Sequence, residues 1–465
     1  MPHDAPPAPD DRRLIAREHH AAGRHELALA AMREAVRETV AATDLNDLAV
    51  IAAGAGRFDA ARAVLRAAEE IAPGDPDVRE NLEALGPGPL DVAALRAGSL
   101  GPALSPKLLG HLLGSPPPGD ERLSARIDRI PSATTPRERW LYHNTMALLW
   151  SGAADVFENG PLLGGTTRAA CLGMLANPRR ADGPRLHTHD WFRTDVAQDG
   201  GDADLSALVP AGQLDGLVAQ GLATPGALAI LRAEGDFEPL VRELHAGQDY
   251  SPLLDIHRSA LPDAPEDVGR LPGLWAPPPG ARYEIAFVDA CKSWFGTRWF
   301  LERMAPATGP GFLLALQDFG WHTCFWVSAA MGLMLDRARL VAYEGTTYVF
   351  EFPDGLRADD VARMPATLEE LGGAGVDEVY GRLLAWAWSL DDSWLLLSLS
   401  LQHAAALASL GYREEARRRI TALAGRPEYA GTEAPAAFHR PMALRLIRQA
   451  RDTPTYRPDG SAVRL

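Results

Sequence analysis

The sequence predicts an α/β domain that is preceded by an all-α region and followed by further helices. In the middle of the chain, near-continuous apolar strands alternate with helical segments. Near the N-terminus a helical pattern recurs after 33 residues, and a stretch rich in Trp and Leu, 379–410, follows the last strand. Apolar strands separated by helices are typical of a mostly parallel sheet covered on both faces. We therefore expect ligands at the carboxyl ends of these strands.

The length, net charge and cysteine content of the chain argue against several classes of function. The chain has 465 residues, enough for two or three domains, and carries a net charge of −15. This charge argues against a nucleic-acid or anionic-membrane binder, because no excess of cations exists to meet phosphates. No apolar run is long enough to span a bilayer, and no signal-peptide pattern opens the chain. The three cysteines lack metal-ligand spacing, so we expect a cytoplasmic protein without disulfides.

The N-terminal region is expected to be a helical repeat. After a polar, Pro-rich tail at 1–11, predicted to be disordered, Gly23-Arg24-His25-Glu26-Leu27-Ala28 is echoed by Gly56-Arg57-Phe58-Asp59-Ala60-Ala61. The offset and the helical spacing of Ala and Leu over 12–86 resemble tetratricopeptide repeats. The resemblance implies a scaffold or a homodimer interface. Residues 87–136 carry Pro and Gly clusters, which predict a linker with short helices.

The stretch Val156–Asn177 is the strongest candidate for a binding site. An apolar strand end runs into Glu158, then into a glycine-rich turn, then into a helix. Glycines allow close approach of a ligand to the backbone, and a helix N-terminus presents free N–H groups. The spacing E-x-G-x-x-x-G-G is neither a dinucleotide fingerprint nor a phosphate loop. A tight structural turn between a strand and a helix remains the alternative interpretation.

Further strands are predicted to end in acids. The segments 186–192, 283–289 and 311–318 are apolar and contain Asp190, Asp289 and Asp318 at or near their carboxyl ends. A strand is also expected at 253–257, and a final hairpin at 339–352 turns at Glu344-Gly345. With Glu158, four acids would then lie along one edge of the sheet.

This order of motifs resembles class I S-adenosylmethionine-dependent methyltransferases. The segment F-E-N-G-P-L-L-G-G-T-T-R is similar to the glycine motif of the macrocin O-methyltransferase-like and cephalosporin-hydroxylase-like groups, and F-V-D-A-C-K-S-W and Q-D-F-G-W follow in the family's order. The resemblance covers about 137–352. It implies a Rossmann-like fold of seven strands, the last antiparallel, over a domain at 137–355, with S-adenosylmethionine above the first two strands.

The resemblance assigns roles to particular residues. Glu158 would lie near the amino group of the cofactor, and Asp190 would accept hydrogen bonds from the ribose hydroxyls. Trp191 and Phe192 would cover the adenine, with a plain core position as the alternative for both rings. The full set of expected cofactor residues is Glu158, Gly160, Gly164, Gly165, Thr166, Asp190, Trp191, Phe192 and Asp289.

The catalytic candidates lie at the mouth of the expected pocket. They are Asp289, Lys292, Asp318 and His322, any of which could take a proton or pair with a charge. A magnesium ion, if present, would use Asp289 and Asp318. Gln317 stands where the family has an acid, so we favour Lys292 over Mg²⁺ as the counter-charge of the two carboxylates. His322 as a structural histidine is the alternative to a base.

Three functions remain open at this stage. The first is O-methylation of a small, perhaps glycosylated, natural product in secondary metabolism. The second is a non-catalytic scaffold of the same fold that recruits a biosynthetic partner. The third is N-methylation of a peptide or a carrier-tethered substrate. Helices are expected over 356–450, with the Trp residues in the core or an interface, and a loose tail over 451–465.

Overall fold

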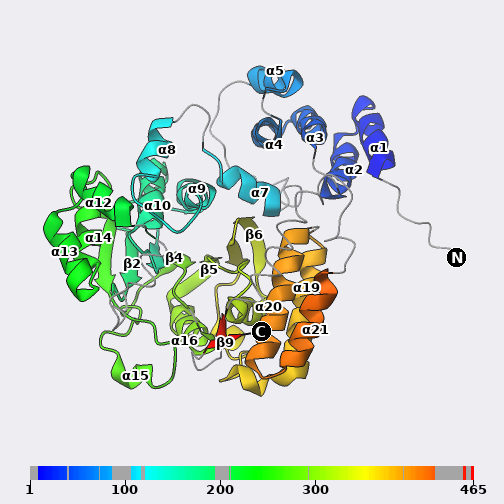
Figure 1. Cartoon of the computed structure of the whole chain (residues 1–465). Helices are drawn as coiled ribbons and strands as arrows, with labels where there is room; N and C mark the ends of the chain where they lie inside the picture. Colours follow the sequence, from blue (N-terminus) through cyan, green and yellow to red (C-terminus); the bar gives the residue numbers. More distant parts are fainter. Residues whose placement is uncertain are drawn as a thin grey trace. The chain divides into compact units, whose positions relative to one another are not determined.

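A computed structural model describes most of the chain as two compact units, Met1–Leu113 and Gly114–Leu465 (Figure 1). The described residues are 9–38, 41–72, 74–85, 106–116, 121–193, 209, 211–291, 293–390, 392–424, 454–456 and 462–464. The units divide inside 87–136, the segment expected to be a linker. The expected disordered tail, 1–11, lies mostly outside the described residues, although a helix already begins at Pro9.

The first unit is helical wherever it is described. Its helices are α1 (Pro9–Ala21), α2 (His25–Glu38), α3 (Ala42–Gly54), α4 (Phe58–Ile71), α5 (Pro76–Leu85) and α7 (Pro106–Leu113). The closest packing is between α1 and α2 and between α3 and α4. Gly23 and Gly56 adopt φ values of 72° and 76° in the two turns, a conformation that glycine adopts without steric cost. The 33-residue echo therefore marks two equivalent helix–turn–helix pairs.

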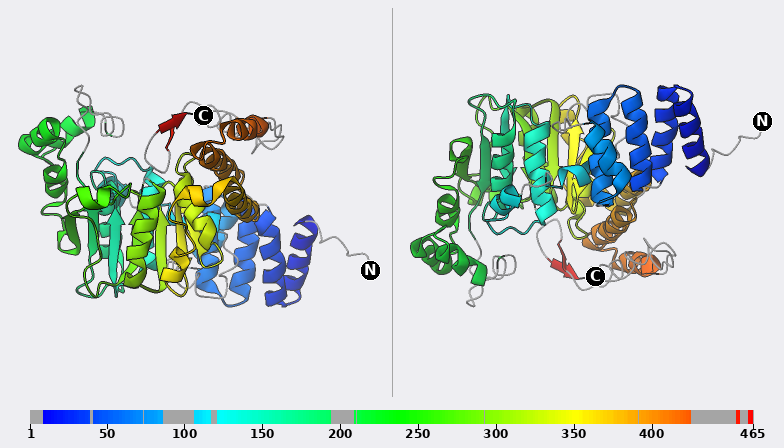
Figure 2. Two further views of the ribbon diagram at one scale, coloured as in Figure 1. Left: turned by 90° about the horizontal axis from the view of Figure 1, so that it is seen from below. Right: turned by 90° about the horizontal axis from the view of Figure 1, so that it is seen from above.

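The second unit contains a seven-stranded mixed sheet in the order β3-β2-β1-β4-β5-β7-β6 (Figure 2). Its strands are β1 (Asp155–Asn159), β2 (Leu186–Asp190), β3 (Leu254–Arg258), β4 (Tyr283–Val288), β5 (Thr308–Leu316), β6 (Arg339–Glu344) and β7 (Thr347–Phe352). The first five run parallel, and β7 is antiparallel to both β5 and β6. The expected mostly parallel sheet, the strand at 253–257 and the final hairpin are confirmed.

Helices cover both faces of this sheet. On one face α9 (Pro136–Asn144) continues into the π-helical turn η1 (Thr145–Leu149) and packs on α10 (Gly165–Ala176), near α8 (Glu121–Ile127). The ring of Tyr142 in α9 stacks on Phe287 of β4 at 4.2 Å. On the other face α16 (Trp294–Met304) and α17 (Phe325–Met334) bury Phe157, Val288 and Leu316. Side chains alternate along each strand, so the two faces carry different residues.

The C-terminal helices share the core of the sheet. They are α18 (Ala358–Val361), α19 (Gly372–Trp388), α20 (Ser393–Ser409) and α21 (Arg413–Ala424), and their buried residues form one cluster with α16 and α17. The expected helices over 379–410 are confirmed, and Trp386 and Trp394 pack partly buried against this cluster. Trp388 is 69% exposed, so a core position is wrong for this ring. Gly411, at φ 92°, forms the turn of a last helical hairpin. Two short strands, β8 (Pro454–Tyr456) and β9 (Ala462–Arg464), pair within the region expected to be loose.

Three helices fill much of the segment between β2 and β3. They are α12 (Ala211–Ala219), α13 (Pro225–Glu234) and α14 (Glu238–His245). Their apolar side chains form a separate buried cluster that includes Leu163 of the glycine turn and Phe192 after β2. The short helix α15 (Asp267–Arg270) and the 3₁₀ turns η2 (Ser251–Leu253), η3 (Ala305–Ala307) and η4 (Leu368–Glu370) complete the connections. None of the described helices is long and apolar enough to cross a membrane.

Candidate functional site

Glu158 is buried and held by three hydroxyl groups. Thr166 and Thr167, in the first turn of α10, donate to its carboxylate at 2.8 and 2.5 Å, and Thr188 of β2 donates at 2.7 Å. Burial raises the pKa of Glu158, the hydroxyls lower it, and the nearby charge of Asp289 raises it further. Glu158 thus fastens α10 and β2 to β1, and the hydroxyl of Thr166 is used in this contact.

The glycines of the turn allow close packing against the protein itself. A Cβ atom on Gly164, which adopts φ 88°, would lie 2.0 Å from Nε2 of His245. A Cβ atom on Gly165 would lie 2.6 Å from that of Ser132. Gly160, at φ 78°, lies against Asp289 and Ala290 at the end of β4. The alternative interpretation of a tight structural turn therefore accounts for Gly164 and Gly165.

Asp190 ends β2 on the same face of the sheet as Glu158 and Thr188. Restricted access to water raises its pKa to about 7, the backbone N–H groups of Phe192 and Trp191 lower it, and the charges of Asp289 and Glu158 raise it. Phe192 is fully buried against Phe237 and is a core residue. Trp191 keeps partial exposure, so it is the ring that remains available to a ligand.

The carboxylates of β1, β2 and β4 are close enough to influence one another. Asp289 raises the pKa of both Glu158 and Asp190. Tyr142 lies in the same region, since burial and then the charges of Glu158 and Asp289 raise its pKa well above the ordinary value. This gathering of negative charge favours a ligand or a side chain that carries positive charge.

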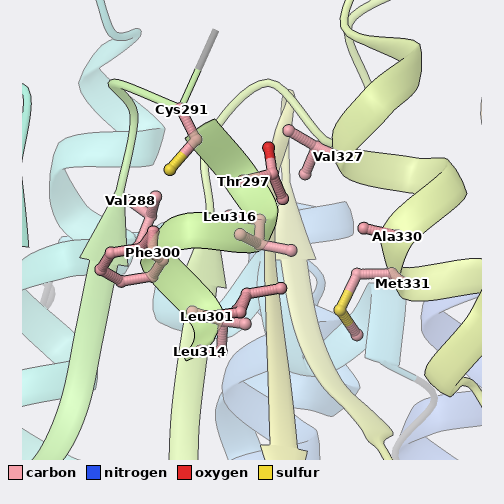
Figure 3. Close-up of a pocket in the computed structure, with 10 residues that line it drawn as sticks. All are labelled: Val288, Cys291, Thr297, Phe300, Leu301, Leu314, Leu316, Val327, Ala330 and Met331. Carbon is pink, nitrogen blue, oxygen red and sulfur yellow. The ribbon is translucent and has the colours of Figure 1, made fainter. Parts of the chain in front are cut away.

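Asp289 and Asp318 line one small cavity at the ends of β4 and β5. Its volume is about 10 Å³, close to the space that one water molecule needs, and Gln317, Cys291 and Cys324 also line it. A second, apolar cavity of about 10 Å³ lies beside it, where side chains of α16 and α17 converge on Val288 and Leu316 (Figure 3). The two aspartates therefore face the same space.

Backbone strain is concentrated at the carboxyl edge of the sheet. Among the described residues other than glycine, positive φ occurs at Leu162, Phe192 and Asp318, with values of 53°, 54° and 64°. These residues follow β1, β2 and β5, respectively. Non-glycine residues in this conformation carry strain, which clusters at functional sites when the surrounding structure enforces it. The strain supports this edge as the functional region.

The remaining catalytic candidates have different surroundings. His322 is buried beside Trp321, and burial lowers its pKa to about 4, so it is neutral at pH 7. Lys292 lies outside the described residues, so its expected role as counter-charge stays a prediction. Gln317 accepts a hydrogen bond from the Tyr142 hydroxyl at 3.1 Å, which occupies one of the two lone pairs of its amide oxygen.

Two residues of this region were not assigned by the sequence. Tyr142 was assigned no role, although it lies among the acids. His245 was not singled out, and burial lowers its pKa to about 3. The sequence does carry signals for the helices between β2 and β3, of which α14 contains His245. Thr224 caps α13 before Pro225, and Gly235 ends α13 with φ 66°. The position of His245 over Gly164 is tertiary and has no local signature.

No known family model matches the chain. A comparison with curated proteins also finds no match.

Proposed function

We propose that the second unit is an S-adenosylmethionine-dependent methyltransferase with a Rossmann-like fold. One observation carries the proposal: Glu158, Asp190 and Asp289, from three neighbouring strand ends, gather beside a turn that opens a helix. A cofactor with a sulfonium and an ammonium group would offset their charge. The seven strands, with β7 antiparallel, agree with the fold that the motifs imply.

The residues present suit such a cofactor. Asp190, at the end of β2, would accept hydrogen bonds from two adjacent ribose hydroxyls, and half-buried Trp191 would lie against the adenine. Gly160 keeps the end of β1 close to Asp289, at the point where the methionine part would bind. When bound, the cofactor supplies an electrophilic methyl group. Glu158 contributes its charge and holds the turn in place.

The acceptor would bind at the mouth between β4 and β5. Asp289 and Asp318 face one cavity there and can orient a hydroxyl group, and Asp318 can take its proton. His322, with a pKa lowered to about 4, is a weaker candidate for the base. We favour transfer without magnesium, because Gln317 supplies a neutral oxygen where a third carboxylate would stand, and this oxygen already accepts a hydrogen bond from Tyr142. A small natural product as acceptor rests on family analogy.

The packing of other side chains over the glycine turn favours a second function, that of a non-catalytic scaffold. Because His245 and Ser132 pack on Gly164 and Gly165, the unit could bind a partner without methyl transfer, as a scaffold. The paired helices of the first unit suit this role as a tetratricopeptide-like module. Exposed Leu14, Leu27 and Phe58 offer it apolar contacts. N-methylation of a peptide or carrier-tethered substrate would use the same cofactor site.

Calorimetry with S-adenosylmethionine tests the proposal on the full-length chain. Wild type and Asp182→Ala, an exposed acid that precedes β2, should bind alike, whereas Asp190→Ala should lose most of the affinity. A folded wild type that does not bind would contradict the proposal. Binding without transfer of a labelled methyl group to any acceptor in a metabolite extract would favour the scaffold.

A further inference from the structure

A cluster of imidazoles and carboxylates lies on the face of β2 and β3 opposite Asp190. In the parallel register of these strands, His187 pairs with Asp255 and His189 pairs with His257. Because side chains alternate, all four project from the face that also carries Phe157, whose ring stacks on His189 at 5.0 Å. The cluster is therefore separated from the acidic edge by the sheet itself.

Three of these side chains have the spacing of metal ligands. Nδ1 of His187 lies 3.2 Å from Nε2 of His257 and 3.7 Å from Oδ2 of Asp255. One donor atom from each residue lies within 4.8 Å of the others. Metal–nitrogen and metal–oxygen bonds of about 2.0–2.2 Å in a tetrahedral site place neighbouring donor atoms roughly 3.3–3.6 Å apart. A hydrogen bond between the two imidazoles would explain the first distance, and the carboxylate, which also pairs with Arg185, lies close enough to complete a set of three donor atoms.

A second layer of contacts orients two of the three side chains. The other ring nitrogen of His187, Nε2, lies 3.5 Å from Oδ2 of Asp155 on β1. The other oxygen of Asp255, Oδ1, accepts a hydrogen bond from Arg185 at 2.6 Å. Histidines that bind a metal commonly donate their second N–H to a carboxylate, and ligating carboxylates are themselves hydrogen-bonded. The cluster thus has the supporting partners that metal sites use.

The site is also accessible. His187 and Asp255 are partly exposed and His257 is exposed, because β3 is an edge strand. Two imidazole nitrogens and one carboxylate oxygen suit Zn²⁺ and similar transition ions, whereas Mg²⁺ and Ca²⁺ prefer oxygen ligands. We propose that His187, Asp255 and His257 bind a zinc-class divalent ion, with a fourth position open to water, and that this ion clamps the edge strand β3 to β2.

Zinc titration of the untagged, full-length protein tests the site. Wild type should bind one equivalent of Zn²⁺ that His257→Ala and Asp255→Asn both lose, as measured by competition with a chromogenic chelator. His257 is exposed, so its replacement should leave the circular dichroism spectrum unchanged. The matched control is the double variant His20→Ala/His25→Ala, which removes another close pair of imidazoles, 3.2 Å apart, in the first unit. This control should retain the equivalent.

Two further measurements distinguish a specific metal site from nonspecific metal binding. Co²⁺ bound to the wild type should give visible absorption bands of a low-coordinate ion, and these should vanish in His257→Ala. Asp155→Asn should weaken zinc binding by about 10–100-fold without abolishing it, as removal of an outer partner does. Unchanged zinc stoichiometry in His257→Ala and Asp255→Asn, or loss of the equivalent in the control, would overturn the proposal.

Discussion

The turn after β1 and the mouth between β4 and β5 lie at the same edge of the sheet but are built differently. At the turn, the carboxylate of Glu158 accepts hydrogen bonds from three hydroxyls, and His245 and Ser132 fill the space over the glycines. At the mouth, Asp289 and Asp318 line a cavity, and Asp318 is held at φ 64°. The difference indicates that Gly164 and Gly165 serve close packing, and under the proposed function the acceptor chemistry would fall to the strand-end aspartates.

The largest effect is expected from a side chain that fills the space over the turn. Gly164→Ala should destabilise the protein by about 3 kcal/mol, because the methyl group meets His245 and because φ is positive. Gly247→Ala is the matched control: φ is 66° there, with nothing within 4 Å of the added atom, so about 1 kcal/mol is expected. Urea unfolding measures both. Equal losses would mean that the turn is not closed by His245.

Removing the carboxylates should separate stability from function. Glu158→Met leaves three buried hydroxyls without their acceptor and should cost at least ~2 kcal/mol of unfolding free energy. Asp318→Asn keeps a residue type that tolerates positive φ, so stability should stay within about 0.5 kcal/mol. The Asp318→Asn variant should instead lose much of the rate of methyl transfer. A chelator should leave the rate of the wild type unchanged. A large loss of stability in Asp318→Asn would show that Asp318, like Glu158, stabilises the fold.

A smaller effect is expected where the two regions meet. Tyr142→Phe removes the hydrogen bond to Gln317 and should cost about 1 kcal/mol, while its stacking on Phe287 is kept. The freed amide oxygen would then be available to a cation at the mouth. If Mg²⁺ stabilises this variant against heat but not the wild type, Tyr142 is what keeps the site from binding magnesium.

The first unit should contribute nothing to cofactor affinity. The compact unit that starts at Gly114 contains the sheet, its helices and all the expected cofactor residues. A chain that begins there should bind S-adenosylmethionine as the full-length chain does. Weaker binding by a truncated chain with an unchanged circular dichroism spectrum would place part of the site in the first unit.

The sequence predicted the sheet well because its signals are local. Apolar strands that end in acids located β1, β2, β4 and β5, and the Glu344-Gly345 turn located the final hairpin. It predicted less of the site. That Thr167 and Thr188 would donate to Glu158, or that α14 would return to cover Gly164, depends on contacts between residues 9, 30 and 81 positions apart, which leave no periodic pattern. The register that joins His187 to Asp255 and His257 is likewise a property of strand pairing.

The pH dependence of cofactor binding tests whether Asp190 belongs to a cofactor site. Burial raises the pKa of Asp190 to about 7, so its carboxyl is largely protonated at pH 6 and largely ionised at pH 8. Binding of a cation with ribose hydroxyls needs the ionised form, so affinity should rise with pH and level off above 7. Between pH 6 and 8 we expect roughly a tenfold gain in the affinity of wild type for S-adenosylmethionine.

Asp190→Asn should bind more weakly, and its affinity should not vary between the two pH values. Calorimetry on both proteins measures this directly, with Asp182→Ala as the control that keeps the wild-type profile. A cofactor site at the end of β2 predicts all three of these pH profiles. A folded wild type that binds no S-adenosylmethionine at either pH, or an Asp190→Asn variant with the wild-type profile, would contradict it.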